Sequence, residues 1–215
     1  LPIFIALFPF VRMVAVTGSL AMDNPGQDGD IDYMIVTSPG RVWLCRAMVI
    51  ALVHWAALSG NILCPNLILS SDALTSAQRN LYIAHEITQL VPLSGAAIYF
   101  RLRELNTWVY DYLPNATDAP PRKIQITPII PFTLTRLIER SLSGGIGLRL
   151  EKWEMRRKMK RFARQYPNAA EAAFCADWCM GYFDGHGYKS MKAYHSRLEQ
   201  MGIHVGISDA FSEPV

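Results

Sequence analysis

The chain contains few charged residues for its length. Only 18% of its 215 residues are Asp, Glu, Lys or Arg, whereas 51% are hydrophobic. This composition excludes an intrinsically disordered chain and predicts a folded protein with a sizeable core. The net charge of +3 is too small to indicate a nucleic-acid partner, so such a role would require a local cluster of basic residues.

Cysteine is also scarce, and its spacing predicts no disulfide framework. The four cysteines are Cys45, Cys64, Cys175 and Cys179, and no secretory signal precedes them, so we expect a reducing, cytoplasmic location. The last two lie one helical turn apart without the ligand spacing of a zinc site, and we interpret them as core residues. Because the chain starts at Leu1 inside an apolar segment, we expect a natural N-terminal piece to precede it.

Apolar runs long enough to span a membrane are missing from the sequence. The run LPIFIALFPF at residues 1–10 is interrupted by two prolines, and AMVIALVHWAAL occupies only residues 47–58. Both are shorter than the roughly 20 residues that a transmembrane helix needs. We therefore expect no membrane span, and we interpret residues 47–58 as part of a buried helix.

The first half of the chain alternates strand and helix patterns, which predicts a mixed α/β (α+β) fold with a small sheet and flanking helices. Three further helices are predicted in the second half, after a proline-rich stretch. We thus divide the chain into a mixed domain (1–114), a linker (115–131) and a helical C-terminal region (132–215). The predicted strands are 13–17, 30–37 and 62–70, and the predicted helices are 3–12, 41–59, 71–91, 95–112, 132–142, 148–165 and 168–182.

Two aspartates begin the strand predicted at residues 30–37. Because side chains alternate along a strand, Asp30 and Asp32 point to the same face. Uncompensated carboxylates in a strand are costly, and paired carboxylates suit Mg²⁺ bound together with substrate phosphates. Ahead of them, Gly18 and Ser19 end the preceding strand, where glycine permits close approach of a phosphate and serine offers a hydroxyl donor. Together these residues describe a site for a metal ion and a triphosphate.

This pattern resembles the signature of the DNA polymerase β-like nucleotidyltransferase superfamily. That signature is an apolar residue, Gly, then Gly or Ser, a gap of about ten residues, and Asp-apolar-Asp-apolar. Here Gly18 and Ser19 are followed by residues 20–29 and then by Asp30, Ile31, Asp32 and Tyr33. The resemblance covers roughly residues 10–100.

The resemblance implies an enzyme that transfers a nucleoside monophosphate from an NTP to an acceptor hydroxyl, with two Mg²⁺ or Mn²⁺ ions and release of pyrophosphate. Ser19 would contact the terminal phosphates, and Gly18 would permit their close approach. Asp30 and Asp32 would hold the metals. The acceptor stays open between a small molecule, a protein and a nucleic acid.

The family also places a third carboxylate on a later strand. In this chain the equivalent position is Asn66, an amide that can ligate a metal through its oxygen but is a poor base. The nearest acid after that strand is Asp72. The alternative function is a catalytically inactive nucleotide-binding or interaction module of the same fold. A calcium loop starting at Asp28 is excluded, because Tyr33 and Pro39 stand where Gly and Glu are required.

Basic residues concentrate in one helix predicted late in the chain. Residues 148–165 contain eight Lys or Arg and two Glu, which indicates an amphipathic basic helix. One interpretation is a helix docked by its apolar stripe with a solvated basic face. Alternatively, Arg156, Lys160 and Arg164 contact phosphates of an acceptor or a nucleic acid, or the helix binds a membrane surface together with residues 124–134. The apolar stripe consists of Leu148, Met155, Met159, Phe162 and Tyr166.

Polar and aromatic residues are mixed densely between residues 79 and 115. They are candidates for an acceptor pocket, although core packing explains most of the aromatic residues equally well. The candidate contacts are Arg79, Asn80, Glu86, Asn106 and Trp108.

Overall fold

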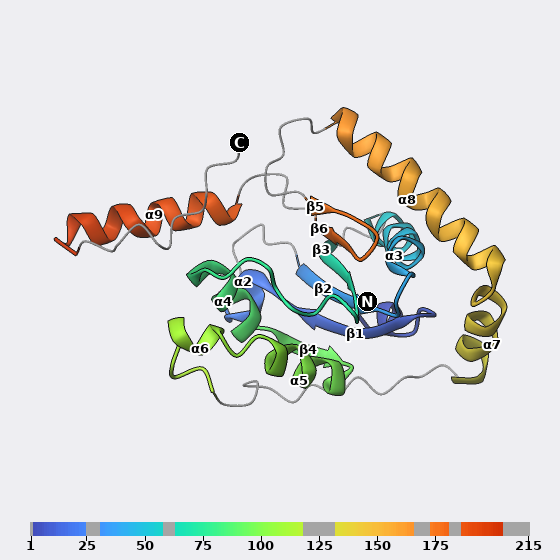
Figure 1. Cartoon of the computed structure of the whole chain (residues 1–215), viewed down its shortest axis with the longest axis horizontal. Helices are drawn as coiled ribbons and strands as arrows, with labels where there is room; N and C mark the ends of the chain where they lie inside the picture. Colours follow the sequence, from blue (N-terminus) through green and yellow to red (C-terminus); the bar gives the residue numbers. More distant parts are fainter. Residues whose placement is uncertain are drawn as a thin grey trace.

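A computed structural model describes residues 2–24, 31–57, 63–117, 132–165, 173–180 and 186–203. The centre of this described part is a mixed sheet with the strand order β4-β1-β2-β3-β6-β5 (Figure 1). β1 pairs antiparallel with β4 and β2, β2 pairs parallel with β3, and β6 pairs antiparallel with β3 and β5. The strands are β1 (Val11–Val16), β2 (Ile31–Thr37), β3 (Leu63–Ser70), β4 (Val91–Ser94), β5 (Ala173–Phe174) and β6 (Trp178–Met180).

Helices cover both faces of this sheet, and the predicted mixed α/β (α+β) class is confirmed. One face packs against α1, α3 and α8, and the other packs against α4, α5 and α6. The helices are α1 (Pro2–Ala6), α2 (Gly18–Ala21), α3 (Val42–Ala57), α4 (Leu81–Thr88), α5 (Ala96–Leu105), α6 (Val109–Tyr112), α7 (Phe132–Leu142), α8 (Gly145–Gln165) and α9 (His186–Gln200).

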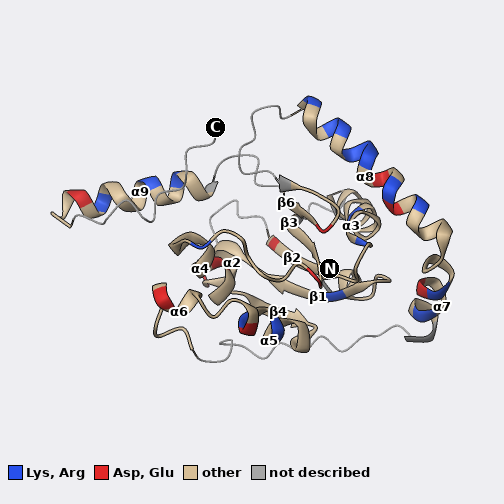
Figure 2. Cartoon of the chain, in the orientation of Figure 1, with Lys and Arg blue, Asp and Glu red and all other residues tan. Residues whose placement is uncertain are grey.

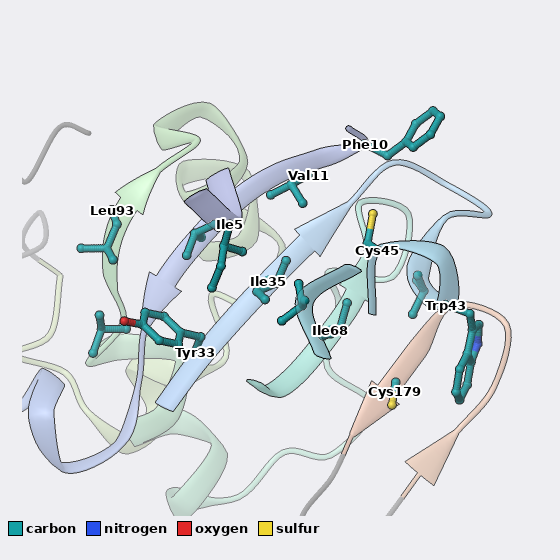
Figure 3. Packing of buried hydrophobic residues seen from close by; sticks show 14 of the residues in the cluster. Ile5, Phe10, Val11, Tyr33, Ile35, Trp43, Cys45, Ile68, Leu93 and Cys179 are labelled. Carbon is teal, nitrogen blue, oxygen red and sulfur yellow. The ribbon is translucent and has the colours of Figure 1, made fainter. Parts of the chain in front are cut away.

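Side-chain alternation in β2 explains why this strand is apolar on both sides. Tyr33 and Ile35 pack into the cluster under α3 (Figure 3), whereas Met34 and Val36 pack into the cluster under α4 and α5. All four side chains are buried. By the same alternation Asp32 belongs to the α4 side of the sheet, and this places the predicted site between β2 and α4.

The helix predicted over residues 71–91 is wrong in its first half. Ser71 and Asp72 cap no helix, and α4 begins only after Asn80, whose side chain accepts a hydrogen bond from the Ile83 amide at 2.9 Å. Asparagine is among the preferred N-cap residues, since its side chain satisfies an amide that the first helical turn leaves unpaired. Pro92, which directly follows the end of the predicted helix, lies in β4, at an edge of the sheet where a residue without an N–H is tolerated.

The helix predicted over residues 168–182 is also wrong where the structure describes it. Residues 173–180 form a short hairpin, β5 and β6, in which the Cys175 amide donates to the Trp178 carbonyl at 3.0 Å. Cys179 is buried and pairs with Ile68 of β3, so the prediction that Cys179 lies in the core is confirmed although its strand was missed. Part of the predicted helical C-terminal region therefore extends the sheet.

Two long-range contacts fix α7 and α8 to the first half of the chain. Glu151 of α8 is buried, and its carboxylate accepts hydrogen bonds from the backbone amides of Trp43 and Leu44 at 2.8 and 2.7 Å. These amides belong to the first turn of α3, where no intrahelical acceptor is available. Arg41 donates to the carbonyl groups of Leu142 and Ser143 at the end of α7. Each helix end is thus capped by a side chain from a distant segment.

Within the described residues, no helix combines the length and the apolar composition that crossing a bilayer requires. Most of the predicted linker, residues 118–131, lies outside the described residues, and so does Tyr166 of the predicted apolar stripe.

Candidate functional site

Gly18 lies directly against the carboxylate of Asp32. Gly18 follows β1 with a φ of +66°, in the left-handed region that favours glycine. A Cβ at this position would lie 2.5 Å from Asp32 Oδ2, and the neighbouring Thr17 amide donates to the Asp32 carbonyl at 3.0 Å. The predicted proximity of the Gly-Ser strand end to the second strand is therefore confirmed at Gly18 and Asp32. Ser19 is exposed beside them.

This contact gives a stability prediction with a matched control. Gly40 also has a positive φ, +64°, but nothing lies within 4 Å of the position that a Cβ would take there. Gly40→Ala should therefore lower the free energy of unfolding by about 1 kcal/mol through backbone strain alone, whereas Gly18→Ala should lower it by about 2–3 kcal/mol because it also collides with Asp32. Urea unfolding measures both. The extra loss should vanish when Asp32→Ala is added, and equal losses in the two single variants would contradict the contact.

Asn66 reaches Asp32 because β3 contains a bulge. Asp32 pairs with Cys64 and Met34 pairs with Leu67, so two residues of β3 face one residue of β2. Such a bulge redirects a side chain, and it accommodates Pro65, which has no N–H for the ladder. The Asn66 side-chain NH₂ donates to Asp32 Oδ1 at 2.6 Å.

Asp72 lies far from this contact. It follows the last residue of β3, Ser70, which pairs with Thr37 at the other end of β2 from Asp32. These two ends of β2 lie roughly 16 Å apart at about 3.3 Å per residue. The exposed side chain of Asp72 cannot replace the third carboxylate. Asp30 and Asp28 lie outside the described residues.

Glu86 brings a second carboxylate toward Asp32 from α4. Burial first, and then the negative charge of Asp32, raise the pKa of Glu86 to about 7, while a hydrogen bond from the Tyr82 hydroxyl acts in the opposite direction. Sequence reasoning named Glu86 only as a candidate acceptor contact, since nothing in its spacing relates it to a strand 54 residues earlier. The one signal in the sequence was the position of Glu86 among the apolar residues Ala84 and Ile87. In the structure both of these residues are buried in the core.

The raised pKa of Glu86 predicts a pH dependence of stability. Below its ordinary pKa of 4.5 the carboxyl is protonated in both the folded and the unfolded chain. As the pH rises from 4.5 to about 7, only the unfolded chain loses the proton, so the free energy of unfolding should fall by about 1–3 kcal/mol. Glu86→Gln should flatten this part of the profile, as measured by urea unfolding at a series of pH values. A variant profile parallel to that of the wild type would contradict the assignment.

Two of the candidate acceptor contacts are structural. The Asn106 side chain is fully buried and bonds to the carbonyl groups of Leu74 and Leu102 and to the Ser76 amide. Trp108 is buried and donates its indole N–H to Asn106. These polar atoms hold α5, α6 and the loop before α4 together, so the suggestion that they line a pocket is wrong. Asn80 is the cap of α4.

The basic residues of α8 do not approach Asp32. Arg156, Lys160 and Arg164 are exposed on α8, which packs against α3 and α7. Figure 2 shows this basic helix at one margin of the molecule, well separated from the start of β2. The structure therefore brings together Gly18, Asp32, Asn66 and Glu86, and places the three basic candidates elsewhere.

The described residues offer a partial ligand set for a cation. Asp32 is oriented by Asn66, and the negative charge of Asp32 acts on Glu86. A divalent cation would relieve the repulsion between the two carboxylates, and oxygen donors of this kind suit Mg²⁺. Among the described residues, which leave out Asp30, no group of three or more His, Cys, Asp or Glu side chains is arranged to hold a metal ion.

Comparison of the chain with protein-family models, with curated proteins and with solved structures finds no match in any of the three.

Proposed function

We propose that this protein is a nucleotidyltransferase, which transfers a nucleoside monophosphate from an NTP to an acceptor hydroxyl. The observation that carries the proposal is the contact between Gly18, at the end of β1, and the Asp32 carboxylate at the start of β2. Gly18 has no room for a side chain, packs against the Asp32 carboxylate and is followed by the exposed Ser19. Backbone N–H groups and the Ser19 hydroxyl are therefore donors beside a carboxylate. Phosphate and a divalent cation need these groups together.

Each residue would have a separate task in this reaction. Asp32 and Asp30 would hold Mg²⁺ or Mn²⁺, and Asn66 would keep the Asp32 carboxylate in one orientation through its 2.6 Å hydrogen bond. Ser19 would donate to a phosphate oxygen. Glu86 would provide a further carboxylate from α4. The resemblance expects an acid on β3, but β3 carries Asn66 at that position. The metal, when bound, would neutralise the triphosphate and the developing charge on the leaving pyrophosphate.

Incubation with each of the four labelled NTPs and Mg²⁺ or Mn²⁺ tests the proposal. We expect release of pyrophosphate together with transfer of label to the protein, to water or to a supplied acceptor, and loss of both products on addition of EDTA. Absence of NTP binding and of pyrophosphate release with every NTP would overturn the proposal.

A second function is favoured by Asn66 itself. Because Asn66 brings no charge to the site, the described residues also suit a module that binds a nucleotide without turnover. The same experiment separates the two functions, since metal-dependent NTP binding without pyrophosphate release identifies the inactive module.

A further inference from the structure

We propose that the outer face of α8 binds an anionic membrane surface. This outer face consists of Ile146, Arg149, Leu150, Trp153, Arg156 and Lys160, which are all exposed. Their spacing of three and four residues places them on one side of the helix. The proposal is independent of the nucleotidyltransferase site, because α8 is separated from Asp32 by α3.

The charge exposed on α7 and α8 is almost entirely positive. Residues 132–165 contain ten Lys or Arg but only three Glu. All three Glu side chains are engaged within the protein: Glu139 with Arg12, Glu151 with the first turn of α3, and Glu154 with Arg157. The basic side chains consequently have little acidic compensation on this surface, and Figure 2 shows blue Lys and Arg positions recurring along α8 with few red ones. Such a surface is complementary to anionic headgroups.

Large apolar side chains are exposed on the same face. Ile146 and Trp153 are 69% and 61% exposed, and Leu150 is also exposed. On the adjoining α7, Leu134 and Leu137 are 54% and 62% exposed. The prediction that α8 docks by an apolar stripe is confirmed for Phe162, which is buried in the core, and for Met155 and Met159, which pack against it. It is wrong for Leu148, which is exposed. The exposed apolar residues are therefore a second set, on the opposite side of the helix.

The cations and the tryptophan surround a recess of approximately 410 Å³, which is lined by Arg149, Lys152, Trp153, Arg156, Arg157 and Lys160. The Arg157 guanidinium lies 5.3 Å from the centre of a Trp153 ring. An indole beside cations suits the boundary between headgroups and acyl chains, where the ring is apolar and its N–H stays hydrated. Phosphate groups would occupy the recess while Ile146 and Leu150 enter the acyl boundary. Nucleic acid would use the cations and the indole but would gain little from exposed aliphatic side chains.

Sedimentation with vesicles tests the proposal on the full chain. We expect binding to vesicles of 30% phosphatidylglycerol and 70% phosphatidylcholine at 0.1 M NaCl, weaker binding at 0.5 M NaCl, and none to pure phosphatidylcholine. Arg156→Gln with Lys160→Gln should weaken binding roughly 25-fold, since each cation near an anionic surface contributes about fivefold. Lys189→Gln with Arg197→Gln removes the same charge from exposed positions of α9 and should change binding less than about twofold.

A second double variant distinguishes lipid from other occupants. Ile146→Ser with Trp153→Ser leaves the charge unchanged and should weaken vesicle binding at least about tenfold, because both apolar contacts are lost. Wild-type binding by this variant would overturn the proposal. Three other outcomes would overturn the proposal as well. They are an equal loss of binding in the α9 control, displacement of the protein from vesicles by single-stranded RNA, and self-association that depends on the outer face of α8.

Discussion

Asp32→Ala is expected to lower the rate of pyrophosphate release by at least about 10²- to 10³-fold, because it removes a carboxylate that would hold the metal beside the phosphates. The substitution removes the acceptor of the hydrogen bond from the partly buried Asn66, and the loss of this bond should cost about 1–2 kcal/mol of stability. The fold should survive. Steady-state rates of pyrophosphate release, measured with urea unfolding on the same samples, separate loss of chemistry from loss of structure.

Asp72→Ala is the matched control for this prediction. Asp72 is an exposed acid that follows the other end of β3, so its removal changes the net charge equally without touching the site. Its rate should stay within about twofold of the wild type. If both variants retained full activity, the transfer would have to occur elsewhere in the protein.

Glu151→Ala is expected to produce a large loss of stability, about 3 kcal/mol. In the native chain the backbone amides of Trp43 and Leu44 donate to the Glu151 carboxylate at 2.8 and 2.7 Å. The substitution leaves both amides without this acceptor. Trp43 is fully buried, so water cannot readily replace the lost bond, and each unsatisfied buried amide costs about 1–3 kcal/mol. The start of α3 should also detach from α8. Urea unfolding measures the loss.

Glu154→Ala provides the comparison for Glu151→Ala. Glu154 is equally buried, but its partner Arg157 has a side chain that is 47% exposed. After the substitution this guanidinium can be hydrated, so the loss should be nearer 1 kcal/mol. Equal losses in the two variants would show that removing side-chain volume, and not the cap of α3, controls stability here.

The strands around the site were predictable because local patterns determine them. The apolar run after Asp32, the glycine at the end of β1 and the turn-forming residues between them are read within about 25 residues of sequence. Hence the contact between Gly18 and Asp32 could be anticipated, and the proximity of Asn66 to Asp32 followed from its place on the next strand. A proline such as Pro65 within a strand favours an edge or a bulge, and the bulge of β3 is what directs Asn66 to Asp32.

Other features depend on packing between distant segments. Glu86 approaches Asp32 only because α4 lies on that face of the sheet, and Glu151 reaches α3 only because α8 docks there. In the sequence, Glu151 is one of two acids in a basic helix, with no pattern to mark it as a cap. The hairpin of β5 and β6 was missed because strands of two and three residues carry no detectable period.

The most direct test of the proposed site is a titration with Mn²⁺ in the presence of a non-hydrolysable NTP analogue, in which electron paramagnetic resonance measures the free Mn²⁺. The wild type and Asp72→Ala should bind Mn²⁺ together with the analogue, and Asp32→Ala should bind at least about tenfold more weakly. Binding to Asp32→Ala with wild-type affinity, or no analogue-dependent binding to the wild type, would contradict a metal and nucleotide site at Gly18, Asp32 and Asn66.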